Sequence, residues 1–182
     1  VRLAQDAARE AGRMPRVAVD AGAHMFSATA FWECEAPHDL LISNGLASMG
    51  FALPAGIAAA LHDPARGAIA FTGDGGFMMV AGELATVADS GARLVTIVFN
   101  DAALSLIDIK QQSRQLPPEG VRWQRPDFAK VAEGFGVKGF VATTPSEYRA
   151  ALRQAFAQDG PSLIDVHVDP AGYPAQLQAM RG

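Results

Sequence analysis

Two short motifs combine residue types that could bind a metal ion together with a phosphate group. They are Gly73-Asp74-Gly75-Gly76 and Asn100-Asp101. Glycines let backbone N–H groups approach a bound anion closely, and a helix that begins after them adds the positive end of its dipole. A carboxylate in such a loop would repel phosphate unless a divalent cation lies between them, and Mg²⁺ prefers oxygen ligands. The first motif therefore predicts a metal ion bound to a phosphate.

Neither motif is specific by itself. A Gly-Asp-Gly triplet is as often a tight turn between a strand and a helix, and an Asn-Asp pair after a strand is most often a turn or a helix cap. The loop also lacks the third glycine of the dinucleotide-binding pattern G-x-G-x-x-G. A right-handed crossover, however, returns the chain to the same edge of a parallel sheet, so Asp101 should lie beside Asp74. The backbone carbonyl of Ala103 could then complete the ligands that the protein supplies.

The segments that must position these residues alternate between short apolar runs and longer stretches of helical period, which is typical of βαβ units. Strands are expected at residues 16–20, 40–43, 68–72, 94–100, 138–142 and 162–168. Helices are expected at residues 2–11, 24–32, 50–61, 80–90, 103–112, 127–134, 145–157 and 173–180. Thr144 and Glu147 are suited to capping the start of the helix at 145–157. The predicted fold is α/β: an open, doubly wound, mainly six-stranded parallel sheet with helices on both faces.

One long irregular segment, residues 113–126 (SRQLPPEGVRWQRP), interrupts this pattern. It contains three prolines and three arginines. A loop of this length in a compact domain is usually a functional lid or a disordered segment. The sequence leaves open whether this segment closes over an anionic substrate or is a loose surface loop.

Composition limits the classes of protein to which the chain can belong. Its 182 residues fit one domain, and 49% hydrophobic with 19% charged residues indicate a folded core. The net charge of -4 without a basic run argues against nucleic acid, and no apolar stretch is long enough for a membrane helix. The single cysteine, Cys34, suits a reducing compartment, so we expect a cytoplasmic protein. The chain begins with Val1 and not Met, so we expect a domain of a longer enzyme.

The two motifs together resemble the cofactor signature of thiamine diphosphate-dependent enzymes. Residues 43–55 also look like the segment that precedes this signature in acetolactate synthase-like and benzoylformate decarboxylase-like members, and residues 125–137 and 160–168 resemble the downstream half of the same domain. The resemblance implies that residues 1–182 form the C-terminal, diphosphate-binding domain of such an enzyme. It implies thiamine diphosphate and Mg²⁺ as cofactors.

The resemblance also assigns roles to residues at the diphosphate end of the cofactor. Asp74, Asp101 and the carbonyl of Ala103 would hold Mg²⁺, with Asp101 in place of the more familiar Asn. Gly73 belongs to the same loop, and the amides of Gly75 and Gly76 would bind the diphosphate. The triplet Gly22-Ala23-His24 stands where related synthases carry Gly-Gln-His. His24 can still donate a hydrogen bond to the diphosphate, whereas Ala23 cannot replace the glutamine amide.

Met49 would be the large apolar residue that forces the cofactor into its bent conformation. The carbonyl of Ala47 and the amide of Met49 would hold the pyrimidine ring. Without the resemblance, Met49 reads as ordinary core filling. Further along the chain, Leu106 and Ile107 are candidates for substrate contact or for plain helix packing. Lys110 lies where many acetolactate synthases place a tryptophan, so it is either a third residue on the substrate side or a solvated lysine.

By this resemblance the expected function is a lyase or transferase that decarboxylates a 2-keto acid or joins its acyl group to an acceptor. Two alternatives remain: a related enzyme that acts on acyl-CoA thioesters, and a cofactor-binding or regulatory subunit without catalysis. In this family a glutamate in the N-terminal domain of a partner subunit activates the cofactor. We therefore expect a homodimer or homotetramer at full length, and no turnover by these 182 residues alone.

Overall fold

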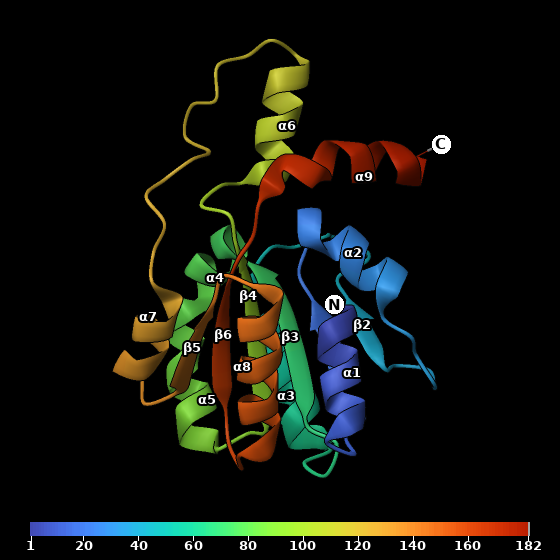
Figure 1. Cartoon of the computed structure of the whole chain (residues 1–182), viewed down its shortest axis with the longest axis vertical. Helices are drawn as coiled ribbons and strands as arrows, with labels where there is room; N and C mark the ends of the chain where they lie inside the picture. Colours follow the sequence, from blue (N-terminus) through green and yellow to red (C-terminus); the bar gives the residue numbers. More distant parts are fainter. Residues whose placement is uncertain (182) are drawn as a thin grey trace.

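A single parallel sheet forms the centre of the molecule (Figure 1). The computed structural model describes residues 1–181. The strands are β1 (Arg16–Val19), β2 (Leu40–Ile42), β3 (Ala68–Gly73), β4 (Leu94–Asn100), β5 (Lys138–Ala142) and β6 (Ser162–His167). Their order across the sheet is β2-β1-β3-β4-β6-β5, and every neighbouring pair is parallel. The predicted open, doubly wound α/β sheet is confirmed.

Helices cover both faces of the sheet. They are α1 (Arg2–Glu10), α2 (Ala23–Phe31), α3 (Ala52–His62), α4 (Asp74–Val80), α5 (Leu84–Ser90), α6 (Ser105–Ser113), α7 (Phe128–Gly134), α8 (Pro145–Ala157) and α9 (Tyr173–Arg181), with short 3₁₀ turns at Ala81–Glu83 and Pro170–Gly172. One apolar cluster joins α1, α2 and α8 to the sheet, and a second joins α3, α5 and α7 to the opposite face. Both faces of the strands are therefore buried.

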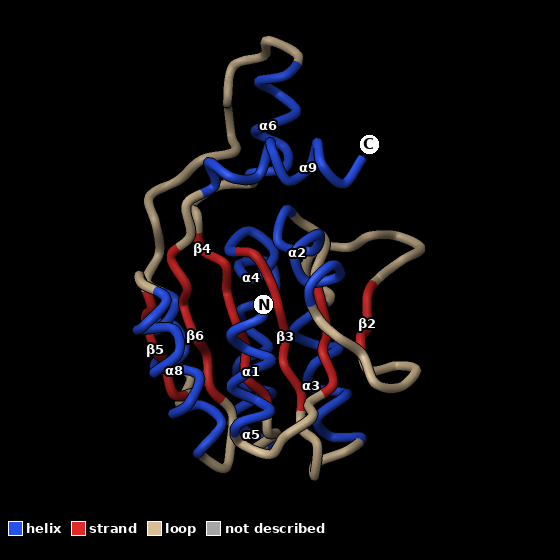
Figure 2. The backbone as a smooth tube through the Cα atoms, turned by 45° about the vertical axis from the view of Figure 1, so that its right-hand side comes forward, coloured by secondary structure: helices blue, strands red, loops and turns tan. Residues whose placement is uncertain are grey.

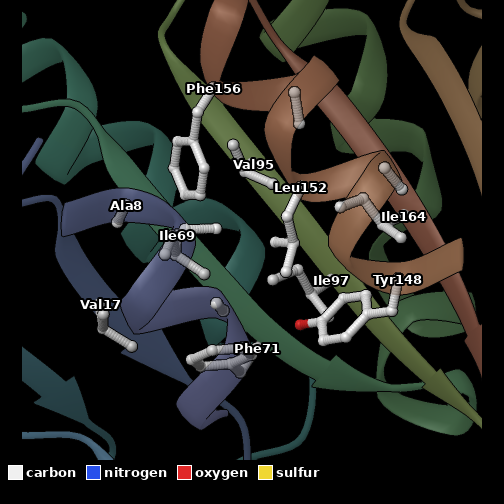
Figure 3. Close-up of a cluster of buried hydrophobic side chains, with 14 of the residues drawn as sticks. Ala8, Val17, Ile69, Phe71, Val95, Ile97, Tyr148, Leu152, Phe156 and Ile164 are labelled. Atoms are coloured by element: carbon white, nitrogen blue, oxygen red, sulfur yellow. The ribbon is translucent and has the colours of Figure 1, made fainter. Parts of the chain in front are cut away.

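Alternating residues of each central strand enter the two clusters. In β3, Ile69 and Phe71 belong to the first cluster, whereas Ala68 and Ala70 belong to the second. Figure 3 shows Ile69 and Phe71 in the first cluster, together with Leu152 and Phe156 of α8. Successive side chains of a strand point to opposite faces, so a sheet covered on both sides needs a continuous apolar run. This requirement explains why these strands could be read from the sequence.

The predicted boundary that differs most from the structure is the start of the helix at residues 80–90, whereas the other predicted boundaries differ by at most two residues. The sequence placed a helix at residues 80–90, but helical structure already begins at Asp74 and continues through α4, a 3₁₀ turn and α5. Glycine has low helix propensity, so Gly75 and Gly76 concealed this first turn. Phe77, which is fully buried in the second cluster, anchors α4 to the sheet. Tertiary packing thus outweighs local propensity at the start of α4.

The chain reverses its winding direction between β1 and β3. The connection from β1 leads outward to β2, whereas the connection from β3 leads the other way to β4. Ligands of open α/β sheets bind at such a switch point, outside the carboxyl ends of the strands. Figures 1 and 2 show α6 and α9 beyond this same edge of the sheet. The fold therefore places the carboxyl ends of β1, β3 and β4 beneath α6 and α9.

The close packing of β5 on α7 gives a test of the fold. A Cβ atom at Gly139 would collide with the carbonyl group of Ala129. We expect Gly139→Ala to lower the free energy of unfolding by about 1–3 kcal/mol, because backbone cannot move aside as a flexible side chain can. Urea denaturation monitored by circular dichroism measures this change. Gly134→Ala is the matched control, since a Cβ at Gly134 would have no neighbour within 4 Å apart from adjacent residues and the backbone of its own helix. Equal losses in both variants would contradict the packing.

Candidate functional site

A cavity of about 280 Å³ opens at the carboxyl ends of β1, β3 and β4. It gathers residues from five segments that are far apart in the sequence. The residues predicted to contact the cofactor or its metal all line it: Gly22, Ala23, His24, Ala47, Met49, Gly73, Asp74, Gly75, Gly76, Asp101 and Ala103. Of the residues predicted for substrate contact, Leu106 and Ile107 of α6 also line the cavity. Lys110 is exposed on α6 and is not among the lining residues.

Asp74 and Asp101 converge on one backbone N–H group. The N–H of Ala103 lies 3.2 Å from Oδ2 of Asp74 and 3.2 Å from Oδ1 of Asp101. Asp74 also accepts a hydrogen bond from the amide of Gly75 at 2.8 Å, and Asp101 accepts one from the Ser105 hydroxyl at 2.6 Å. The two acids that the crossover argument placed together are therefore neighbours, held by the loops after β3 and β4.

The charges of this pair are poorly compensated by protein groups. Burial, with a further contribution from the charge of Asp101, raises the pKa of Asp74 to about 7. Burial also raises the pKa of Asp101. Two carboxylates that share one donor repel each other, and a divalent cation between them would remove the repulsion.

The donor set fits Mg²⁺. Among the described residues, no group of three or more His, Cys, Asp or Glu side chains could hold a metal ion. Mg²⁺ is usually bound through one or two carboxylates, with phosphate oxygens and water completing its octahedron. The carbonyl of Ala103 is available as a further oxygen in the cavity wall. A pair of carboxylates beside an open cavity therefore suits Mg²⁺ bound to a phosphate ligand.

Strained backbone shapes two walls of the cavity. Ala47 and Ala102 have positive φ values of 51° and 63°, which residues other than glycine rarely adopt. Ala102 lies between Asp101 and Ala103, and Ala47 lies in the turn that leads to Met49. Such conformations persist only where the surroundings fix them, and they cluster at functional sites. Both turns are thus held in place before any ligand binds.

Part of the irregular segment 113–126 is fixed to the site. The amide of Leu104 donates to the carbonyl of Val121 at 2.8 Å, and the amide of Trp123 donates to the carbonyl of Ala102 at 3.1 Å. In addition, Arg122 forms a two-pronged ion pair with Asp108 of α6. Residues 121–123 therefore form a stable wall beside the Asp101 loop, which argues against a wholly loose surface loop.

His24 is a buried neutral imidazole that lines the cavity. Burial lowers its pKa to about 4, so the ring is uncharged at neutral pH. The ring stacks on Phe99 at a centroid distance of 5.7 Å, and Nε2 has no hydrogen-bond partner among the described residues. Gly22 and Gly73 make room for it, since Cβ atoms there would lie 2.7 Å from Cε1 and 3.2 Å from Nδ1. The unpaired Nε2 could bond to a ligand.

The cavity contains residues that the sequence did not single out. Phe99, Leu104 and Tyr173 line it, and Tyr173 comes from α9 at the far end of the chain. Burial, together with the charges of Asp101 and Asp74, raises the pKa of the Tyr173 hydroxyl above its ordinary value. Asp20, directly after β1, is fully buried and accepts hydrogen bonds from the backbone amides of Gly50 and Ala52, which follow Met49 in the chain. Its position after a strand was the only sequence signal for Asp20.

Comparison with known proteins gives this geometry its context. Residues 20–166 match the family described as "Thiamine pyrophosphate enzyme, C-terminal TPP binding domain". The matched span includes each residue predicted for the cofactor and metal. The chain belongs to this family.

Relatives of this thiamine pyrophosphate family member include several acetolactate synthases. The acetolactate synthase of Bacillus subtilis is 35% identical over 153 residues, covering 84% of this chain and 27% of the relative. The probable acetolactate synthase large subunit of Methanocaldococcus jannaschii is 34% identical over 157 residues, with 85% and 27% covered. Acetolactate synthase isozyme 1 large subunit of Escherichia coli is 32% identical over 157 residues, with 84% and 28% covered. The chain thus spans little more than a quarter of the length of these relatives.

No helix within residues 1–181 is both long and apolar enough to cross a membrane.

The raised pKa of Asp74 predicts a pH dependence for the metal-free protein. The Asp74 carboxyl has a pKa of about 7 in the folded protein and an ordinary pKa of 3.8 in the unfolded chain, so it keeps its proton to a higher pH in the folded state. Its contribution to stability is therefore fully present below about pH 4 and is lost as the pH rises to about 7. We expect the free energy of unfolding of the wild type to fall relative to Asp74→Asn across this range. Urea titrations in EDTA at several pH values measure the difference, and a difference that stays constant with pH would contradict the shift.

Proposed function

We propose that this chain binds thiamine diphosphate through Mg²⁺ as the cofactor domain of a lyase or transferase that acts on 2-keto acids. The observation that carries the proposal is the convergence of Asp74 and Asp101 on the Ala103 amide, at the mouth of a glycine-lined cavity. The family membership supplies the cofactor, and the pair of buried carboxylates supplies the reason for a cation. Neither argument depends on the other.

We assign the roles in the site by element. Asp74, Asp101 and the carbonyl of Ala103 hold Mg²⁺. Residues 73–76 and Nε2 of His24 face the diphosphate. The carbonyl of Ala47 and the amide of Met49 hold the pyrimidine, and the Met49 side chain sets the bend of the cofactor. Support for this division comes from the cavity, which all these residues line together.

The cofactor, when bound, supplies an electron sink for decarboxylation of a 2-keto acid and for transfer of its acyl group. The chain itself binds and orients that cofactor and shapes the space beside it. Leu104, Leu106 and Ile107 of the α6 segment give that space an apolar wall. We propose that Leu106 and Ile107 contact the substrate, and that Lys110, exposed on α6, acts at the rim.

The names of the relatives favour the acetolactate synthase branch of the family for the whole enzyme. We propose that the chain works with an N-terminal pyrimidine-binding domain of a partner subunit, in a cytoplasmic homodimer or homotetramer. That domain would supply the glutamate that activates the cofactor. The small share of each relative that the chain spans supports this division of labour.

Titration calorimetry tests the proposed binding directly. Thiamine diphosphate should bind to the wild-type chain only when Mg²⁺ is present, and Asp74→Ala should weaken binding about a hundredfold or abolish it, because one of two charged ligands is lost. Asp89→Ala is the control, since Asp89 is an exposed residue of α5 and its loss changes the net charge equally. Binding that needs no metal, or equal affinities for both variants, would rule out the proposed site.

A turnover measurement tests the proposed division between domains. We expect the 182-residue chain, loaded with Mg²⁺ and thiamine diphosphate, to release no CO₂ from a panel of 2-keto acids, because the activating glutamate lies in another domain. Release should appear when a pyrimidine-binding domain from a related synthase completes the site. Turnover by the chain alone, at rates typical of such enzymes, would show that the assignment of roles is wrong.

A further inference from the structure

We propose that Asp20 is a positioning residue that fixes Met49 against the Gly73–Gly76 loop. Through its buried carboxylate, Asp20 would fix the position of the pyrimidine side of the site relative to the diphosphate side. The role of Met49 rests on the proposed function, whereas the contacts of Asp20 do not.

Asp20 bonds to segments that are distant in the sequence. Its side chain is completely buried, with an exposed fraction of 0%. Oδ1 accepts from the amide of Ala52 at 2.7 Å, and Oδ2 accepts from the amide of Gly50 at 3.0 Å. Oδ2 also accepts from the Thr72 hydroxyl at 2.7 Å. One carboxylate thereby connects the end of β1, the turn after Met49 and the end of β3.

The glycine loop also packs directly on this carboxylate. A Cβ atom at Gly76 would collide with Oδ2 of Asp20 and would lie 3.2 Å from Oγ1 of Thr72. Gly76 is therefore glycine because Asp20 occupies the space behind it. This contact gives Gly76, the third glycine of the loop, a reason that is separate from any ligand.

The bonds to Asp20 constrain Met49 more than they constrain the glycine loop. Gly50 follows Met49 directly and has a φ of 78°, so its amide orientation sets the course of the turn. Two other backbone hydrogen bonds restrain this turn less. The amide of Ala47 donates to the carbonyl of Ser43, which is only four residues away, and the amide of Ala21 donates to the carbonyl of Ser48 at a long distance of 3.5 Å. The Gly73–Gly76 loop, in contrast, continues β3 and is anchored by Phe77 in the core. Loss of Asp20 should therefore loosen the Met49 turn first.

The charge of Asp20 is matched by neutral donors. Its three partners are two amides and one hydroxyl, and the adjacent imidazole of His24 is uncharged because burial lowers its pKa to about 4. An asparagine would have a similar shape, but its NH₂ group would face at least one of these donors. Asp20→Asn therefore removes acceptors while it preserves volume.

Hydrogen exchange of single amides, measured by NMR on the whole chain, tests the positioning. We expect Asp20→Asn to speed exchange at Gly50 and Ala52 by about tenfold or more, beyond any change that a loss of global stability causes at all amides. The reason is that hydrogen bonds to charged groups are stronger than those between neutral groups. Asp39→Asn is the control, because Asp39 is also buried and accepts from the amides of Glu35 and Ala36 far from the cavity, in addition to its ion pair with Arg66. In Asp39→Asn the exchange should rise at those two amides and not at Gly50 or Ala52.

Calorimetry then separates positioning from general stability. Asp20→Asn should weaken binding of thiamine diphosphate with Mg²⁺ by about tenfold or more, but binding of inorganic pyrophosphate with Mg²⁺ by less than about threefold. Asp39→Asn should change neither affinity. If Asp20→Asn does not fold, Thr72→Val removes one of the three hydrogen bonds to Asp20. In that variant, exchange at Gly50 and Ala52 should be about threefold faster, and the affinity for thiamine diphosphate with Mg²⁺ about threefold weaker.

The outcomes distinguish the positioning role from the proposed function. Unchanged exchange at Gly50 and Ala52 would overturn the positioning role, as would equal weakening of thiamine diphosphate and pyrophosphate. A wild-type chain that binds neither ligand would instead overturn the proposed function, and the exchange experiment would still decide whether Asp20 fixes the turn.

Discussion

Repulsion between the Asp74 and Asp101 carboxylates is the constraint around which the carboxyl edge of the sheet is organised. Asp74 is buried and Asp101 is half-buried, and the two carboxylates share the single N–H group of Ala103. The parallel pairing of β3 with β4, in which Gly73 lies opposite Phe99, brings the two loops together and prevents them from separating. A cation with oxygen preference would relieve this constraint, which links the fold to the proposed metal-bound diphosphate.

The surrounding structure keeps the two loops rigid. On the β4 side, Asn100 turns away from the cavity and donates to Asp165 at 2.9 Å and to the carbonyl of Pro126 at 3.0 Å. Asp165 also accepts from the amide of Phe128 at 3.0 Å, so a buried polar network ties β4, β6 and the start of α7 together. Asn100 and Asp101 are adjacent in sequence but serve opposite faces of the strand end. On the β1 side, Asp20 forms the corresponding network with Gly50, Ala52 and Thr72.

Much of this arrangement could be predicted because local and global signals agree. The six strands were readable as apolar runs, since both faces of the sheet are buried. Thr144 caps the start of α8 as expected, and in the structure Glu147 completes a capping box with it. The meeting of Asp74 and Asp101 followed from crossover handedness alone. What the sequence hid depends on contacts between distant residues. Asp20 looks like any acid after a strand, and its partners lie 30 to 52 positions away. Tyr173 reaches the cavity from α9, and glycines masked the start of α4.

The central claim is that Asp74 and Asp101 hold the metal ion of a bound diphosphate cofactor. Anomalous X-ray scattering from crystals grown with Mn²⁺ and thiamine diphosphate tests it most directly, because Mn²⁺ suits the same oxygen ligands as Mg²⁺ and gives an anomalous signal that identifies the metal. We predict one strong anomalous peak between the two carboxylates, within bonding distance of both and of the carbonyl of Ala103, with diphosphate oxygens completing the shell. A cofactor bound with its metal elsewhere, or without metal at this pair, would contradict the account.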